Sequence, residues 1–150
     1  MDDVVVRDLK TISDDRGFIK HIFKKSYFAT MFDAHEVYLS CIYPGIVKGW
    51  HLHRRQTQNY VCISGNIKLV LYDARPASKS SGELCEIFMG DLNHLSVSIP
   101  PGVWNGYTCV GGKPASIINV TNFEHDPSEM ERIDPWETEV VGYKWGPVDK

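Results

Sequence analysis

Short β-rich runs alternate with turn residues along most of the chain, and this pattern limits most strongly what the chain can fold into. The runs are rich in β-branched and aromatic side chains, and Gly, Pro, Asn, Asp or Ser interrupts the chain between them. The predicted strands cover residues 36–43, 61–63, 67–72, 84–88, 95–99 and 115–121. Many short strands joined by turns in one small chain predict an all-β sandwich or barrel.

Two neighbouring runs carry the clearest strand signal. In residues 67–72 every second residue is Ile or Leu, so one face of this strand is strongly apolar. The turn sequence Ser64-Gly65-Asn66 separates it from residues 61–63. This arrangement predicts a hairpin.

Helical signals are few and short. Residues 24–32 predict one or two helical turns, and residues 126–132 predict another that begins near Pro127. With 150 residues, the chain is long enough to bury one core and too short for two comfortable ones. We therefore expect a single domain over residues 1–150.

The C-terminal tail, residues 134–150, is rich in large aromatic side chains. Trp136, Tyr143 and Trp145 all lie within it. Because rings of this size are costly to leave in water, we expect the tail to pack back onto the body of the domain.

The charge balance and hydropathy argue against two classes of partner. The 16 Lys and Arg residues against 19 Asp and Glu residues give a net charge of -3, whereas a general nucleic-acid binder presents a broad basic face. No apolar run approaches the roughly 20 residues that span a bilayer, and the acidic start Met1-Asp2-Asp3 is unlike a secretory signal. We expect a soluble cytoplasmic protein that binds neither nucleic acid nor membranes.

The 4 cysteines, Cys41, Cys62, Cys85 and Cys109, are widely spaced and include no C-x-x-C pair. This spacing argues against a zinc ribbon and against a dense disulfide framework. Because their neighbours are mostly apolar, we expect buried free thiols.

Residues 48–58, K-G-W-H-L-H-R-R-Q-T-Q, hold the densest set of chemically active side chains. If this segment is extended, His51 and His53 lie on one face, and Trp50 and Leu52 lie on the other. Two histidines on one strand face are metal ligands, an acid/base pair or satisfied polar residues.

The spacing around these histidines resembles the cupin motifs. Gly45, His51-x-His53, Gln58 and Gly65 follow the first motif, and residues 100–105, P-P-G-V-W-N, follow the second. The resemblance implies a cupin-type β-barrel or jelly roll with one or two short helical segments. Gln58 and Asn105 are amides where Glu and His are usual, and transition metals favour imidazole and carboxylate ligands. We therefore expect no metal and no other cofactor.

A wider resemblance covers about residues 10–145. Five segments carry it, in order: D-D-R-G-F at 14–18, G-I-V-K-G-W-H at 45–51, a strand ending in Y-D-A-R at 72–75, I-P-P-G-V-W-N-G at 99–106 and R-I-D-P at 132–135. This order resembles the dTDP-4-dehydrorhamnose 3,5-epimerases. The resemblance implies a homodimer that binds a nucleotide-diphosphate 4-keto-6-deoxy sugar without metal and inverts C3, C5 or both, in deoxysugar or polysaccharide biosynthesis.

The same resemblance assigns residues to the chemistry. His51 matches the base that removes a proton next to the ketone, and Asp134 matches the carboxylate that orients it; His53 is the further catalytic candidate. A carbon acid beside a carbonyl needs a positioned base and a means of stabilising the enolate oxygen. A carboxylate on the far ring nitrogen fixes the tautomer of such a base.

The expected substrate-binding residues are Arg16, Lys48, Arg54, Gln58, Asn105 and Tyr38. Arg16 matches the family's diphosphate-binding arginine, whose planar fork can pair with two phosphate oxygens. Lys48, Arg54 and Arg55 form a local basic patch, and a solvated loop explains Arg54 and Arg55 equally well.

The chain also departs from the family. Gln58 replaces a lysine, and the family's catalytic tyrosine falls near Ile118 or Asn119, neither of which is an acid. Inversion needs a proton donor on the second face of the sugar. Another tyrosine must then supply it, and the candidates are Tyr38, Tyr107 and Tyr143.

Two other functions compete with the epimerase. The H-x-H-x-x-x-x-Q segment, followed by Cys62 and Gly65, also resembles the sugar-nucleotide 3,4-ketoisomerases, in which two histidines move protons between adjacent carbons. The segments W-N-G at 104–106 and D-P-W at 134–136 fit the epimerases better. The third alternative is a non-catalytic cupin that binds a sugar nucleotide.

Overall fold

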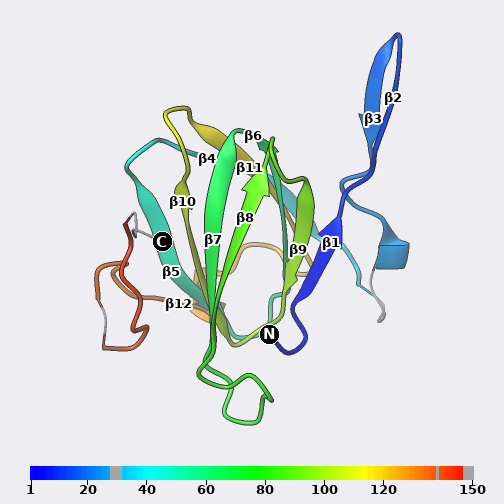
Figure 1. Cartoon of the computed structure of the whole chain (residues 1–150). Helices are drawn as coiled ribbons and strands as arrows, with labels where there is room; N and C mark the ends of the chain where they lie inside the picture. The colour runs from blue at the N-terminus through cyan, green and yellow to red at the C-terminus, as the bar shows by residue number, and fades with distance from the viewer. Residues whose placement is uncertain (28–31, 138, 147–150) are drawn as a thin grey trace.

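The computed structural model describes residues 1–27, 32–137 and 139–146 (Figure 1). The strands are β1 (Val5–Asp8), β2 (Thr11–Asp14), β3 (Gly17–Lys20), β4 (Glu36–Ile42), β5 (Val47–His53), β6 (Gln58–Ser64), β7 (Asn66–Asp73), β8 (Leu84–Gly90), β9 (Leu95–Ile99), β10 (Val103–Cys109), β11 (Ala115–Thr121) and β12 (Met130–Arg132). Two 3-10 turns, η1 (Lys25–Tyr27) and η2 (Pro127–Glu129), complete the elements.

The strands form two sheets that face each other, and a separate hairpin projects from the body (Figure 1). One sheet has the order β1-β9-β6-β11-β4 and the other has the order β12-β5-β10-β7-β8. Neighbouring strands are antiparallel throughout both sheets. The predicted all-β jelly roll with short helical segments is confirmed.

The main core lies between the two sheets. Its fully buried members include Ile67, Leu69 and Leu71 of β7, which face Val97 of β9 and Ile117 of β11 across the sandwich. The alternation of apolar residues in residues 67–72 therefore identified the inward face of β7. Burying side chains of this kind contributes about 1.5–3 kcal/mol each to the stability of the fold.

The turn at residues 64–66 is not a hairpin, and this prediction was wrong. β6 pairs with β9 and β11, whereas β7 pairs with β8 and β10 in the other sheet. Gly65 makes this corner with φ of 72°, and a Cβ atom there would lie 2.5 Å from the carbonyl oxygen of Pro114. The turn residues were recognised, but sheet membership depends on contacts that a short sequence window does not contain.

In the described residues, each of the two expected helical segments contains one 3-10 turn. η1 lies in the first segment, in which residues 28–31 fall outside the described part of the chain. In the second, Asp126 caps η2 by accepting a hydrogen bond from the Ser128 backbone, and the chain then continues as β12. β12 is extended because it pairs with β5, from Met130 opposite His53 to Arg132 opposite His51.

The described part of the C-terminal tail packs on the outer face of the second sheet. The rings of Tyr143 and Trp145 lie 6.0 and 5.0 Å from the ring of Trp50, which is fully buried beneath them. The expected packing is therefore confirmed for these two rings. Trp136 is 64% exposed, so the expectation was wrong for this residue.

All four cysteines are free, and burial differs among them. Cys62 is buried, Cys85 and Cys109 are partly buried, and Cys41 is exposed. The prediction that the thiols are buried is therefore fully confirmed for Cys62 alone. Among the described residues, helical segments are too short and too polar to cross a membrane.

Candidate active site

A cavity of about 350 Å³ opens between the two sheets, beside β4 and β5. Side chains from both sheets form its wall: β4 and β6 belong to the first sheet, and β5, β10 and β12 belong to the second. His51, His53, Lys48, Gln58 and Tyr38 all lie on this wall. The structure therefore brings together five of the nine predicted site residues.

His51 is half-buried on β5, and its side chain makes no hydrogen bond to another residue of the described chain. Burial has the largest effect on the pKa of His51, and together with the electrostatic effects of Arg132, His53 and Lys48 it lowers that pKa to about 4. The imidazole is therefore neutral at neutral pH. A neutral imidazole can accept a proton without first losing one.

His53 lies two residues further along β5 and has very different surroundings. It is buried, and Nδ1 forms a short hydrogen bond with a carboxylate oxygen of Glu129. Nε2 lies 3.1 Å from the side-chain nitrogen of Gln58. Because the carboxylate can only accept when ionised, Nδ1 carries the proton and Nε2 accepts from Gln58.

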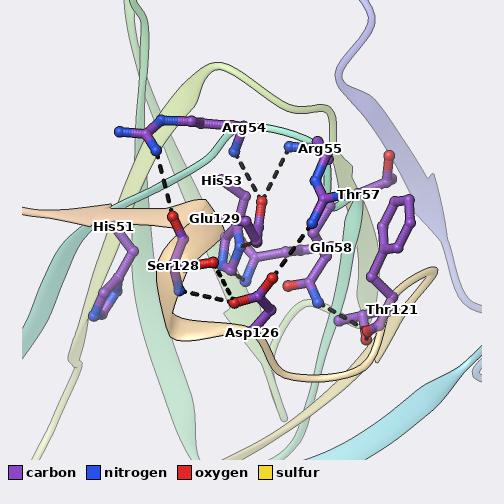
Figure 2. A network of polar contacts seen from close by, with 12 residues as sticks. His51, His53, Arg54, Arg55, Thr57, Gln58, Thr121, Asp126, Ser128 and Glu129 are labelled. Carbon is purple, nitrogen blue, oxygen red and sulfur yellow. Dashed lines mark hydrogen bonds and ion pairs between the residues drawn. The ribbon is translucent and has the colours of Figure 1, made fainter.

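Glu129 stays ionised inside the protein because donors surround it. Burial raises its pKa, but hydrogen bonds from His53 and from backbone N–H groups outweigh burial, and its pKa is lowered overall. The backbone nitrogens of Arg54 and Arg55 donate to Oε2 at 3.0 and 3.1 Å (Figure 2). Figure 2 shows the His51 ring apart from these hydrogen-bonded groups.

The hydrogen bonds continue from His53 through two buried amides. Gln58 Oε1 accepts from the Asn105 side chain at 3.0 Å, and Asn105 Oδ1 accepts from the Tyr60 hydroxyl at 3.2 Å. Each of these amides has one orientation that satisfies all its neighbours. We call Glu129, His53, Gln58, Asn105 and Tyr60 the His53 network.

The His53 network leaves little for a metal ion to bind. Both ring nitrogens of His53 have partners, and the amides at the other two cupin ligand positions, Gln58 and Asn105, are bonded to each other. Within the described residues, no three His, Cys, Asp or Glu side chains are grouped as metal ligands. This donor set does not fit a transition metal.

The opposite wall of the cavity is formed by β4. Lys48 reaches it from β5 and donates to Ser40 Oγ at 2.8 Å and to the Cys41 carbonyl at 2.6 Å. Ser40 Oγ lies 3.0 Å from the hydroxyl of Tyr107. Tyr38, two residues before Ser40, accepts a hydrogen bond from the Asn119 side chain at 2.8 Å.

Asp134 does not meet His51 in the structure. Its side chain is exposed and accepts a hydrogen bond from the Trp136 backbone at 2.8 Å, while its carbonyl accepts from Glu137. β12 ends at Arg132, and the chain has left the cavity by the time it reaches this turn. The cross-strand neighbour that β12 gives to His51 is therefore the cation Arg132.

The two arginines predicted from sequence also lie outside the cavity. Arg16 is 86% exposed near the end of the β2–β3 hairpin, paired with Asp14. Arg54 is exposed and donates from Nε to Glu131 at 3.0 Å. Asn105 lies behind the cavity wall, where it also donates to the His51 carbonyl at 3.1 Å.

The residues of the site that were missed from sequence include Glu129, Arg132, Asn119 and Tyr60. Glu129 follows an Asp-Pro-Ser sequence, which indicates a helix cap. From sequence alone, its carboxylate is interpreted as part of that cap. Its real partner, His53, is 76 residues away. No local signal identifies such a pair.

The model of the dTDP-4-dehydrorhamnose 3,5-epimerase family matches residues 1–150. The chain is 34% identical over 146 residues to the probable low-salt glycan biosynthesis epimerase Agl13 of Haloferax volcanii, covering 95% of this chain and 93% of that protein. It is also 34% identical over 151 residues to the spore coat polysaccharide biosynthesis protein SpsL of Bacillus subtilis, covering 97% and 96%.

A solved structure agrees with these relatives. The dTDP sugar isomerase of Desulfovibrio desulfuricans G20 superposes with a TM-score of 0.87 at 31% identity, covering 98% of this chain and 93% of that one. A double mutant of the 3'-monoepimerase ChmJ of Streptomyces bikiniensis, solved in complex with dTDP, shares the fold with a TM-score of 0.84 at 18% identity, covering 95% and 74%.

Proposed function

The chain belongs to the dTDP-4-dehydrorhamnose 3,5-epimerase family, and on that premise we propose that His51 starts its reaction by removing a proton next to a sugar ketone. The family places the protein among isomerases, as an epimerase of deoxysugar or polysaccharide biosynthesis. The proposed substrate is a nucleotide-diphosphate 4-keto-6-deoxy sugar, inverted at C3, C5 or both.

The observation that carries this proposal is a neutral imidazole on the wall of a cavity, with no hydrogen-bonded partner in the described part of the chain. The C–H electron pair becomes the double bond of an enolate when His51 takes the proton, and negative charge develops on the ketone oxygen. Lys48 and Arg132 line the same cavity, and their ammonium and guanidinium groups would stabilise that charge. An anionic diphosphate near these cations would also raise the pKa of His51 and strengthen it as a base.

The remaining predicted residues take different parts in this proposal. Lys48, Gln58 and Tyr38 present polar atoms to the cavity and are proposed to contact the sugar. Asn105 acts behind the wall, by holding Gln58 and Tyr60 in place. His53 is proposed to be a positioning residue, because both of its ring nitrogens are hydrogen-bonded within the His53 network.

The surroundings of His53 favour an epimerase over a ketoisomerase. A ketoisomerase with two active histidines needs a free nitrogen on each ring. His51 meets this requirement, but His53 does so only if its bond to Glu129 or Gln58 breaks. One histidine base is sufficient for the first step of an epimerisation.

We also propose that the protein is a homodimer. Apolar side chains are exposed on β4, with Val37 63% and Leu39 65% exposed, and on the β2–β3 hairpin, with Phe18 69% exposed. A second copy would remove these surfaces from water. Diphosphate binding by Arg16, and a His51–Asp134 pair, would both require contacts beyond those within the described part of one chain. The molar mass from light scattering tests this, and a monomer at working concentration would contradict it.

The cytoplasm is the proposed location of the reaction. A nucleotide diphosphate carries charges that make its passage through a bilayer very unfavourable, so its enzymes work where it is made.

Incubation with dTDP-4-keto-6-deoxyglucose in deuterated water tests the proposed function. An epimerase places deuterium at C3, C5 or both while the ketone stays at C4, and the sugar is followed by NMR. Movement of the carbonyl to C3 would establish the ketoisomerase instead. Binding of dTDP without any exchange would support the non-catalytic alternative and overturn the proposal.

A further inference from the structure

Inversion of a carbon needs an acid on the face of the sugar opposite the base. His51 projects from β5 of the second sheet, so the opposite face of a sugar in this cavity meets side chains of the first sheet. Three tyrosines, Tyr38, Tyr60 and Tyr107, lie on the cavity wall. Tyr143 lies elsewhere, on the outer face of the second sheet, and donates to Glu86 at 2.5 Å.

Two of the three cavity tyrosines are poorly placed to give up a proton there. Tyr107 belongs to β10, in the same sheet as His51, and its hydroxyl is hydrogen-bonded to Ser40 Oγ at 3.0 Å, which also accepts from Lys48. Tyr60 belongs to the opposite sheet, but its hydroxyl donates to Asn105 within the His53 network. Burial raises the pKa of Tyr60 well above its usual value, and the nearby Tyr38 raises it further.

The hydrogen bond to Tyr38 has a fixed direction. The backbone N–H of Asn59 donates to Oδ1 of Asn119 at 2.9 Å, which identifies that atom as the oxygen of the amide. The other end of the amide, Nδ2, must then be the donor that lies 2.8 Å from the Tyr38 hydroxyl. Asn119 is 1% exposed, so its amide cannot rotate without breaking both bonds in the interior.

The consequence is that Tyr38 uses its oxygen to accept from Asn119, so its own proton points away from that amide, and Tyr60 is the hydroxyl next to it on the cavity wall. Tyr38 is the direct cross-strand partner of Asn119 in the β4–β11 register. It is 39% exposed at the edge of the first sheet, so water can reach its hydroxyl. After proton transfer, the Asn119 amide would remain hydrogen-bonded to the phenolate and stabilise it.

We propose that Tyr38 is the acid that protonates the sugar on the face opposite His51, and that Asn119 is the positioning residue that directs the Tyr38 proton into the cavity. This inference rests on the proposed epimerase function. The Tyr38 O–H bond breaks as a C–H bond forms on the enolate carbon, and the enolate electrons return to the ketone. His51 then releases its proton to water and Tyr38 regains one, so no proton is gained or lost overall.

The test follows two signals for dTDP-4-keto-6-deoxyglucose in deuterated water: deuterium uptake, and the configuration of the product. For Tyr38→Phe we expect uptake within about tenfold of the wild type, because His51 still removes and returns the proton on its own face. Inversion should fall by about 10²–10⁴-fold, as expected when a general acid is lost. Tyr107→Phe and Glu36→Gln are matched controls on the same cavity wall and should still invert.

Each other outcome overturns a different statement. No uptake by the wild type would overturn the epimerase function, and the role of Tyr38 with it. Wild-type inversion by Tyr38→Phe, or loss of uptake together with inversion, would overturn the role of Tyr38 alone. Loss of inversion in Tyr107→Phe or Glu36→Gln, with inversion kept in Tyr38→Phe, would transfer the role to the residue changed.

Asn119→Asp tests the positioning role. A carboxylate still accepts from Asn59 but also accepts from Tyr38, which turns the Tyr38 proton away from the cavity and raises the pKa of that hydroxyl. We expect inversion to fall about 10-fold or more with uptake retained, and the basic limb of the inversion pH profile to move upward. An unchanged basic limb in a folded variant would overturn this role.

Discussion

The two histidines of β5 lie on one face of one strand, yet they occupy two different environments. Both ring nitrogens of His53 have partners within the His53 network, whereas the His51 ring has cations nearby and no hydrogen-bonded partner in the described part of the chain. A satisfied buried network stabilises a single conformation. A polar group left without a partner at a cavity wall is available to a ligand. The difference separates the part of the site that holds the fold from the part that reacts.

The largest effect should come from changing His51 itself. We expect His51→Asn to lower deuterium uptake by about 10²–10⁴-fold, because the proton acceptor is lost. Its free energy of unfolding should stay close to the wild-type value, since no hydrogen bond within the described structure is lost. Uptake measured by NMR and urea denaturation check the two halves of this prediction.

His21→Asn is the matched control, because His21 is exposed and lies outside the cavity. It should leave both uptake and stability unchanged. If His51→Asn kept its uptake while His53→Asn lost it, the assignment of the two environments would be reversed.

The next largest effect should be a loss of stability when the His53 network is disrupted. Glu129→Ala leaves His53 and two backbone N–H groups without their acceptor in the interior. We expect the free energy of unfolding to fall by about 3 kcal/mol. Glu131→Ala breaks only the exposed pair with Arg54 and should cost less than about 1 kcal/mol. Equal losses in the two variants, measured by urea denaturation, would show that the His53 network adds no stability.

Lowering the pH should reduce the stability of the folded protein through the protonation of His51. The pKa of His51 is about 4 in the folded protein and 6.5 as a free group. Between these values the unfolded chain binds a proton that the folded chain does not, so stability should fall as pH falls from 6.5 to 4 and level off below. The difference between wild type and His51→Asn in unfolding free energy, measured across this range, should carry this dependence. The acid limb of kcat/KM should likewise lie near pH 4.

The smallest effect concerns a single charge beside His51. Arg132 lowers the pKa of His51 after burial has already lowered it. We expect Arg132→Gln to move the acid limb of kcat/KM upward by less than about one pH unit. Arg54→Gln removes an exposed charge that is bonded to Glu131 and should leave the limb in place. A downward shift in Arg132→Gln would contradict the electrostatic account.

Much of the fold was predictable because strands and turns have characteristic local sequence patterns. The alternation of apolar residues in 67–72 identified the inward face of β7, and the extended form of 48–53 placed both histidines toward one cavity. The corner at Gly65 shows what such local patterns cannot predict. A glycine that turns a hairpin and a glycine that passes between two sheets need the same backbone freedom.

The candidate site was predictable in part, for the residues that lie close together in sequence. Lys48, His51 and His53 come from one strand, and their spacing is sufficient to place them. The sequence also indicated that residues 118 and 119 lack an acid. It did not indicate that Tyr38 lies directly opposite Asn119 on the neighbouring strand.

The amino-acid sequence by itself determined that this chain forms a jelly roll of short strands, and that one strand carries two histidines facing inward. Only the tertiary structure decided that His53 meets Glu129, 76 residues away, and that Tyr38 meets Asn119, 81 residues away. Backbone periodicity is a local property, whereas a side-chain contact between distant strands depends on sheet order and register. The first contact fixes His53 and leaves His51 as the histidine that can react, and the second fixes the hydrogen bond to the Tyr38 hydroxyl.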